Sequence, residues 1–149
     1  SIAEFIGTFA ITFMGCGAVM VAERYPGMIP AGAIPLIFGL TVAAMIYAVG
    51  HISGAHFNPA VTLAFWVARH FPGREVLWYC IAQFAGAMAA TGLSYLLLPD
   101  GVTFGATVPH IGVWQALGWE ITLNFLLMFV IIAVATDTRA VGKRWLEPL

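Results

Sequence analysis

The stretch from Gly50 to Thr62 is the feature that most constrains how this chain can fold. It reads GHISGAHFNPAVT, and it follows directly on an apolar segment long enough to cross a membrane. Its glycines, its proline and its many polar side chains are unusual in such a place. In lipid, irregular backbone is tolerated only where protein buries it or where it lines a water-filled cavity. The stretch is therefore expected to be buried by protein or to border an aqueous path.

A helix is predicted to begin inside this stretch. Asn58 has the side chain of an N-cap, and Pro59 suits the first position of a helix. A helix over residues 58–70 would be about 20 Å long at the usual rise per residue. This is shorter than the hydrocarbon core of a bilayer, which is roughly 30 Å thick. We therefore predict a re-entrant half-helix whose N-terminus points into the membrane.

Four further segments are long and apolar enough to cross a membrane. They are residues 2–22, 31–50, 76–98 and 113–135. Only 9% of the residues are charged, whereas a soluble domain carries about 25%. We therefore predict an all-α membrane protein, with a single transmembrane domain over residues 1–149 and the lipid bilayer as its partner. The net charge of -1 gives no indication of a nucleic-acid partner.

The basic residues predict the orientation of the chain in the membrane. If the half-helix enters and leaves on one side, that side holds five of the six basic residues. They are Arg69, Arg74, Arg139, Lys143 and Arg144, and the sixth is Arg24. By the positive-inside rule that side is cytoplasmic. The 69–74 loop and the C-terminal tail are thus expected on the cytoplasmic face of a membrane that we take to be the cell (inner) membrane.

Two of the apolar segments carry similar heptapeptides near their starts, AEFIGTF from position 3 and WEITLNF from position 119. Glu4 and Glu120 occupy the same place in them. Carboxylates inside a membrane usually face the bundle interior or a polar cavity. The favoured interpretation is that each glutamate accepts hydrogen bonds from the backbone of a re-entrant loop. Direct contact with a solute and neutralisation by protonation remain open as alternatives.

Weak internal symmetry of this kind is typical of inverted-repeat membrane proteins. A second Asn-Pro-Ala sequence at the matching distance from Glu120 would fall beyond the last residue. The chain also opens at Ser1, at the edge of an apolar segment, rather than at a methionine. We therefore expect that the chain is incomplete and lacks a second half-helix.

Three motifs carry a resemblance to a known family. The sequence HISGAHFNPAVTL, from position 51, resembles the first signature loop of the aquaporin family, the major intrinsic proteins. AEFIGTF resembles the first-helix motif of that family. AVATDTR, from position 133, resembles the end of its fourth helix in bacterial members and in the nodulin-like branch. The resemblance implies an aquaporin-like right-handed helical bundle that assembles as a homo-oligomer, a tetramer. The fifth and sixth helices, the second Asn-Pro-Ala and the constriction arginine of that bundle are missing.

The resemblance also implies a role for each of a small set of residues. The residues that line the pore or contact the solute would be Gly54, Ala55, His56, Phe57, Asn58, Pro59, Ala60 and Phe38. In this reading the four residues before Asn58 present their carbonyls as a ladder of acceptors, and Asn58 donates to the passing solute. Phe38 would narrow the pore at an aromatic constriction. Glu4 and Glu120 would brace the two loops.

The expected function is passive conduction of water or of small neutral solutes such as glycerol. The bulk of Phe38 favours water, whereas the nodulin-like resemblance favours larger solutes. The alternative is a truncated or half-size fragment that forms no conducting pore alone. An enzyme is not expected, because we find no Ser/His/Asp set and no paired acids at one depth. No cofactor is expected, and no metal site, because His51 and His56 are not spaced to share one face of a helix.

Overall fold

The computed structural model describes residues 1–98, 103–106 and 108–136, and these residues form five α-helices. They are α1 (Ile2–Arg24), α2 (Ala33–Ser53), α3 (Pro59–Val67), α4 (Gly73–Leu97) and α5 (Val113–Thr136). All but α3 are long and apolar enough to span a membrane. The prediction of an all-α membrane protein with four spans and one short helix is thus confirmed. The predicted cytoplasmic tail lies outside the described residues.

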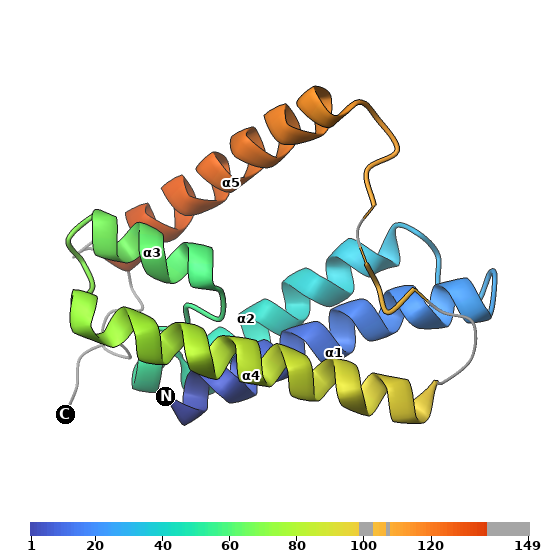
Figure 1. Cartoon of the computed structure of the whole chain (residues 1–149), viewed down its shortest axis with the longest axis horizontal. Helices are drawn as coiled ribbons and strands as arrows, with labels where there is room; N and C mark the ends of the chain where they lie inside the picture. Colours follow the sequence, from blue (N-terminus) through green and yellow to red (C-terminus); the bar gives the residue numbers. More distant parts are fainter. Residues whose placement is uncertain (99–102, 107, 137–149) are drawn as a thin grey trace. The chain divides into compact units, whose positions relative to one another are not determined.

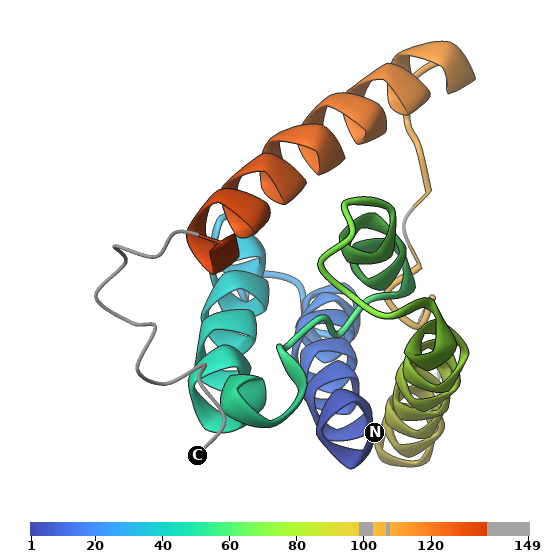
Figure 2. The same cartoon turned by 90° about the vertical axis from the view of Figure 1, so that its left-hand side faces the viewer.

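The chain divides into two compact units. The first contains residues 1–106 and therefore helices α1 to α4, and the second contains α5. Within the first unit, α1 packs between α2 on one side and α4 on the other, as the end-on view in Figure 2 shows. The short α3 lies along the first half of α4 (Figure 1).

Helices α1 and α4 approach closely because small residues of α4 face α1. A Cβ atom at Gly86 would lie 2.4 Å from the carbonyl oxygen of Phe5, so no larger residue fits there. Ala90 and Ser94, one and two turns further on, are also buried. Small residues four apart allow helix backbones to come together in a membrane. Gly86, Ala90 and Ser94 thus form a row of small residues along the α1–α4 contact.

Another glycine, Gly15 of α1, lies at the contact between α1 and α2. A Cβ atom at Gly15 would lie 2.1 Å from the ring of Phe38, so the aromatic ring rests directly on the α1 backbone. In this way α1 accepts an aromatic side chain on one side and the backbone approach of α4 on the other. It is the central helix of the unit.

Helix α3 is shorter than predicted. It ends at Val67, three residues before the predicted end, and it is nine residues long. Arg69 has a left-handed backbone with φ of 61°, and its N–H donates to the carbonyl of Trp66. The N–H of His70 donates to the carbonyl of Phe65. This pair of bonds is the Schellman motif that closes many helices.

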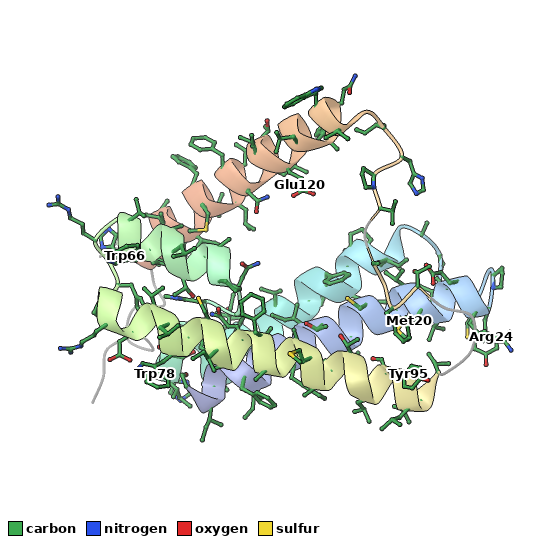
Figure 3. All side chains as sticks on the ribbon, viewed as in Figure 1. Met20, Arg24, Trp66, Trp78, Tyr95 and Glu120 are labelled. Atoms are coloured by element: carbon green, nitrogen blue, oxygen red, sulfur yellow. The ribbon has the colours of Figure 1, made fainter. Side chains whose placement is uncertain are left out.

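Aromatic residues mark the two ends of the first unit. Figure 3 shows Trp66 and Trp78 at the end that holds α3, and Tyr95 and Arg24 at the opposite end. Trp66 is 48% exposed and Trp78 is 61% exposed. Tryptophan and tyrosine concentrate where the bilayer core meets its headgroups. Their positions agree with a unit whose long helices run from one interface to the other.

Candidate functional site

The polar loop 54–58 joins the C-terminus of α2 to the N-terminus of α3. Three of its residues have a left-handed backbone, with φ of 81° at Gly54, 54° at Ala55 and 50° at Phe57. Glycine adopts this conformation readily, but alanine and phenylalanine do so only where surrounding contacts hold them. The loop must therefore be fixed by the residues around it.

The Glu4 carboxylate supplies most of that fixation. One of its oxygens accepts from the Ser53 hydroxyl at 2.6 Å and from the His56 N–H at 3.1 Å. The other accepts from the Phe57 N–H at 2.7 Å and from the Gln83 side-chain amide at 2.8 Å. Glu4 is completely buried. A carboxylate offers about four lone-pair sites, so this arrangement fills its accepting capacity.

Gln83 connects this carboxylate to α3. Its Nε2 donates to Glu4 and also, at 3.0 Å, to the hydroxyl of Thr62. That hydroxyl lies 3.1 Å from Nδ1 of His56 and 3.1 Å from the carbonyl oxygen of Asn58. Helices α1, α3 and α4 therefore meet in one buried polar network around the loop.

The His56 side chain belongs to the protein interior. Its ring stacks on Phe65 with the ring centroids 4.7 Å apart, and it meets Phe71 edge-on at 4.7 Å. Tyr79 lies 5.3 Å away and donates its hydroxyl to the carbonyl of Ser53 at 2.9 Å. His56 is only 8% exposed. The side chain of His56 is thus enclosed by aromatic residues of the protein.

The loop carbonyls fall into two groups. Within the described part of the chain, the carbonyls of Gly54, Ala55 and His56 accept no hydrogen bond. The carbonyl of Phe57, by contrast, accepts from the hydroxyl of Thr8 at 3.1 Å. Among the described residues, three consecutive acceptors therefore have no donor, whereas the fourth is in use.

Asn58 caps α3 as predicted, and Pro59 and Ala60 form the first turn of that helix. The Asn58 Oδ1 accepts from the N–H of Ala60 at 2.8 Å. Its side chain is exposed, and for its Nδ2 the described residues provide no acceptor. The amide is therefore held by its oxygen and presents two N–H donors outward.

The two remaining predicted residues lie on helices α2 and α5. Phe38 is half-buried in the first half of α2, with its ring on Gly15. Glu120 lies exposed on α5 in the second unit (Figure 3), where Asn124 Nδ2 donates to its carbonyl at 2.8 Å and to its carboxylate at 3.2 Å. Across residues 1–98, 103–106 and 108–136, no three His, Cys, Asp or Glu side chains gather as a metal site would require.

Two residues of the network, Gln83 and Thr8, were not predicted from the sequence. Gln83 is a lone amide inside an apolar span, the same signal that singled out Glu4. Thr8 carries no such signal, because threonines are common in transmembrane helices and usually bond to their own helix. Only the fold shows that its hydroxyl reaches a loop 49 residues away in sequence.

The four spans and the buried polar loop define a multi-pass integral membrane protein with irregular backbone held among its helices. A family model described as Major intrinsic protein matches residues 1–149. The chain belongs to the major intrinsic protein family, and its nodulin-like character is confirmed. Members of this family are channels and not enzymes, in agreement with the prediction.

Several plant proteins are close relatives. Nodulin-26 of Glycine max is 45% identical over 143 residues, which cover 95% of this chain and 53% of the relative. Aquaporin NIP1-1 of Oryza sativa subsp. japonica is 48% identical, with 95% and 50% covered. Aquaporin NIP1-1 of Zea mays is 47% identical, with 95% and 51% covered. The chain spans about half the length of the curated relatives it matches.

Proposed function

We propose that this chain forms part of a passive channel for water or small neutral solutes, and that loop 54–58 lines its path. The observation that carries the proposal is the arrangement of this loop. Among the described residues, no group bonds to three consecutive loop carbonyls or to the Asn58 side-chain N–H groups, while Glu4 and Gln83 hold the backbone that carries them. A rigid row of acceptors beside one donor can replace the hydration of a small neutral molecule step by step.

The same arrangement opposes ions. An ion that enters a narrow path loses more hydration than a few carbonyl dipoles return. The N-terminus of α3 adds the equivalent of roughly half a positive charge at the position of Asn58. This field opposes cations and protons at the position of Asn58. Asn58 orients the solute there, and Pro59 and Ala60 set the direction of the helix that carries it.

The remaining residues of the predicted site take supporting roles in this proposal. Glu4 braces loop 54–58 through its four hydrogen bonds. Glu120 holds the matching place in the internal repeat, and it would brace a second loop of the same kind. Phe38 would narrow the path on the far side of Asn58, which would favour water over glycerol.

The surroundings of the channel are also part of the proposal. The chain would lie in the cell (inner) membrane, with the 69–74 loop and the C-terminal tail on the cytoplasmic side, because most of the basic residues are there. It would assemble as a homo-oligomer, a tetramer by the family resemblance. Cross-linking in the membrane, followed by mass determination, tests this assembly.

A channel also needs residues that enclose the path on the side opposite loop 54–58. The relatives are about twice as long as the matched region, so in them further residues are available to form it. For the present chain, the facing wall would come from further residues of a longer protein or from another subunit. The alternative, a half-size unit that does not conduct alone, is therefore tested together with the channel itself.

The test compares three proteins in proteoliposomes by stopped-flow light scattering, with water and glycerol gradients. They are this chain alone, a chimera of this chain with the second half of rice Aquaporin NIP1-1, and intact Aquaporin NIP1-1. We expect the chimera to conduct at least one of the two solutes above the level of empty liposomes. Conduction by the chain alone would exclude the half-size alternative, and its absence would support it.

One outcome would contradict the channel proposal. If intact Aquaporin NIP1-1 conducts and the inserted chimera does not, then the present chain cannot supply the first half of the path. Insertion is verified by protease protection of the same liposomes, so that a failure to insert is not mistaken for a failure to conduct.

A further inference from the structure

Thr8 differs from the other helical threonines whose hydroxyls donate a hydrogen bond. Thr41, Thr91, Thr122 and Thr136 each donate to the carbonyl four residues earlier in their own helix. Thr8 instead donates across to the carbonyl of Phe57, at 3.1 Å, and it is 8% exposed. Back-bonding to the same helix is the usual arrangement for threonine. The deviation at Thr8 shows that this hydroxyl serves the loop rather than its own helix.

Phe57 is held at three points by one face of α1. Its N–H donates to Glu4 at 2.7 Å, and its carbonyl accepts from Thr8. Its ring fills the space above Gly7, where a Cβ atom would lie 2.0 Å from a ring carbon. Residues 4, 7 and 8 are spaced as neighbours on one side of a helix. One turn of α1 therefore contacts the N–H, the carbonyl and the side chain of Phe57.

These three contacts hold the backbone conformation directly before Asn58. Phe57 has a φ of 50°, a left-handed conformation that a residue with a Cβ atom adopts at a cost. The direction of its carbonyl and the direction of the Asn58 side chain depend on the same peptide unit. The hydrogen bond from Thr8 to that carbonyl therefore holds the peptide unit that leads into Asn58, and it occupies one of the loop acceptors.

We propose that Thr8 is a positioning residue for Asn58, which acts by holding the Phe57 carbonyl. The expected effect of Thr8 on permeation rests on the proposed channel function. The expected effect of Thr8 on loop 54–58 does not. If Thr8 positions this peptide, removal of its hydroxyl loosens loop 54–58 even in a protein that conducts nothing.

The structural arm measures amide hydrogen exchange of Phe57 by NMR in the full chain reconstituted in nanodiscs. Thr8→Val removes the hydroxyl and keeps the branched shape, and Thr8→Ser keeps the hydroxyl. Thr91→Val is the matched control, because the exposed Thr91 hydroxyl donates to the carbonyl of Ala87 in its own helix, the usual arrangement. We expect exchange at Phe57 to rise about fivefold in Thr8→Val, the effect of one neutral hydrogen bond. Wild-type rates are expected in the other two variants.

The functional arm measures water permeability per inserted protein, and its activation energy, in the chimera described above. Thr8→Val should lower the permeability and raise the activation energy, and Thr8→Ser should restore both. A lower amount of inserted protein alone would not change the permeability per inserted molecule. If Thr8→Val does not fold, Thr8→Ala replaces it in both arms.

Two results would overturn the proposal. The first is unchanged exchange at Phe57 in the variant without the hydroxyl. The second is a conducting chimera whose permeability per molecule and activation energy do not respond to the loss of the hydroxyl. If the wild-type chimera does not conduct, the channel proposal fails, and the exchange arm still decides the role of Thr8.

Discussion

Glu4 ties together three separate parts of the chain. Its four hydrogen bonds come from Ser53 at the end of α2, from the loop residues His56 and Phe57, and from Gln83 on α4. Hydrogen bonds to a charged group contribute about 1.5–3 kcal/mol each, and a buried donor left without a partner costs a similar amount. A single side chain in the first turn of α1 thus determines whether the loop keeps its shape.

Glu4→Gln should destabilise the protein strongly. The substituted amide turns an N–H donor towards groups that are themselves donors, so at least one hydrogen bond is lost and one contact becomes repulsive. We expect the free energy of unfolding to fall by about 2–4 kcal/mol. The measurement is an SDS titration in mixed micelles. Glu75→Gln is the control, because Glu75 is partly exposed and its ion pair with the exposed Arg74, at 3.6 Å, lies at the surface. Surface ion pairs contribute little to stability. An equal effect of the two substitutions would contradict the bracing role.

Two glycines of α1 should respond to alanine in opposite directions. At Gly7 the new Cβ atom would collide with the ring of Phe57, whereas at Gly17 it would meet no atom within 4 Å. Overpacking costs about 1–3 kcal/mol, and glycine to alanine in a free helical position gains about 0.5–1 kcal/mol. Unfolding titrations of both variants check this, and a neutral or stabilising Gly7→Ala would show that Phe57 is not seated on α1.

The ends of α3 differ in how plainly the sequence shows them. Asn58 and Pro59 give a clear start signal, and the structure confirms both the cap and the proline position. The stop is a Schellman motif with Arg69 in the left-handed position that glycine usually occupies. The sequence therefore lacks the usual stop signal, and the predicted helix ran too far. The start matters more for function, because it places the positive end of the helix at Asn58.

Asn58→Asp should change charge selectivity more than helix stability. Aspartate caps a helix as well as asparagine does, but it removes the outward N–H donors and adds a negative charge that offsets the helix dipole. In the chimera we expect higher proton and cation leak relative to water permeability, measured with a pH-sensitive dye in liposomes. Asn58→Ser keeps a capping side chain without the charge and should not raise the leak. Equal leak in Asn58→Asp and wild type would contradict a barrier at α3.

Most of the architecture could be read from the sequence, but the contacts that hold the site could not. Hydropathy and length place the four spans to within a few residues, because the membrane itself sets both. The bond from Thr8 to Phe57 and the seat at Gly7 depend on which face of α1 meets the loop. No local pattern carries that information. Gln83 is an intermediate case. The sequence shows a lone amide in an apolar span, but it does not show which groups that amide bonds to.

The proposed solute path requires a chain that enters the membrane at loop 54–58 and turns back to the side from which it came. In that arrangement, residues 26 and 74 lie on opposite sides of the membrane, separated by α2 and the returning α3. If α3 crossed the bilayer instead, the two positions would lie on the same side. Both residues are exposed in the structure, so single cysteines introduced there report directly on the path of the chain.

The decisive measurement is therefore labelling of Pro26→Cys and Arg74→Cys in intact cells with a membrane-impermeant maleimide. The native Cys16 and Cys80 are replaced by alanine in both variants. The re-entrant path predicts that Pro26→Cys is labelled in intact cells and that Arg74→Cys is labelled only after permeabilisation. Labelling of both positions from the same side would contradict the re-entrant loop, and with it the proposed path for the solute.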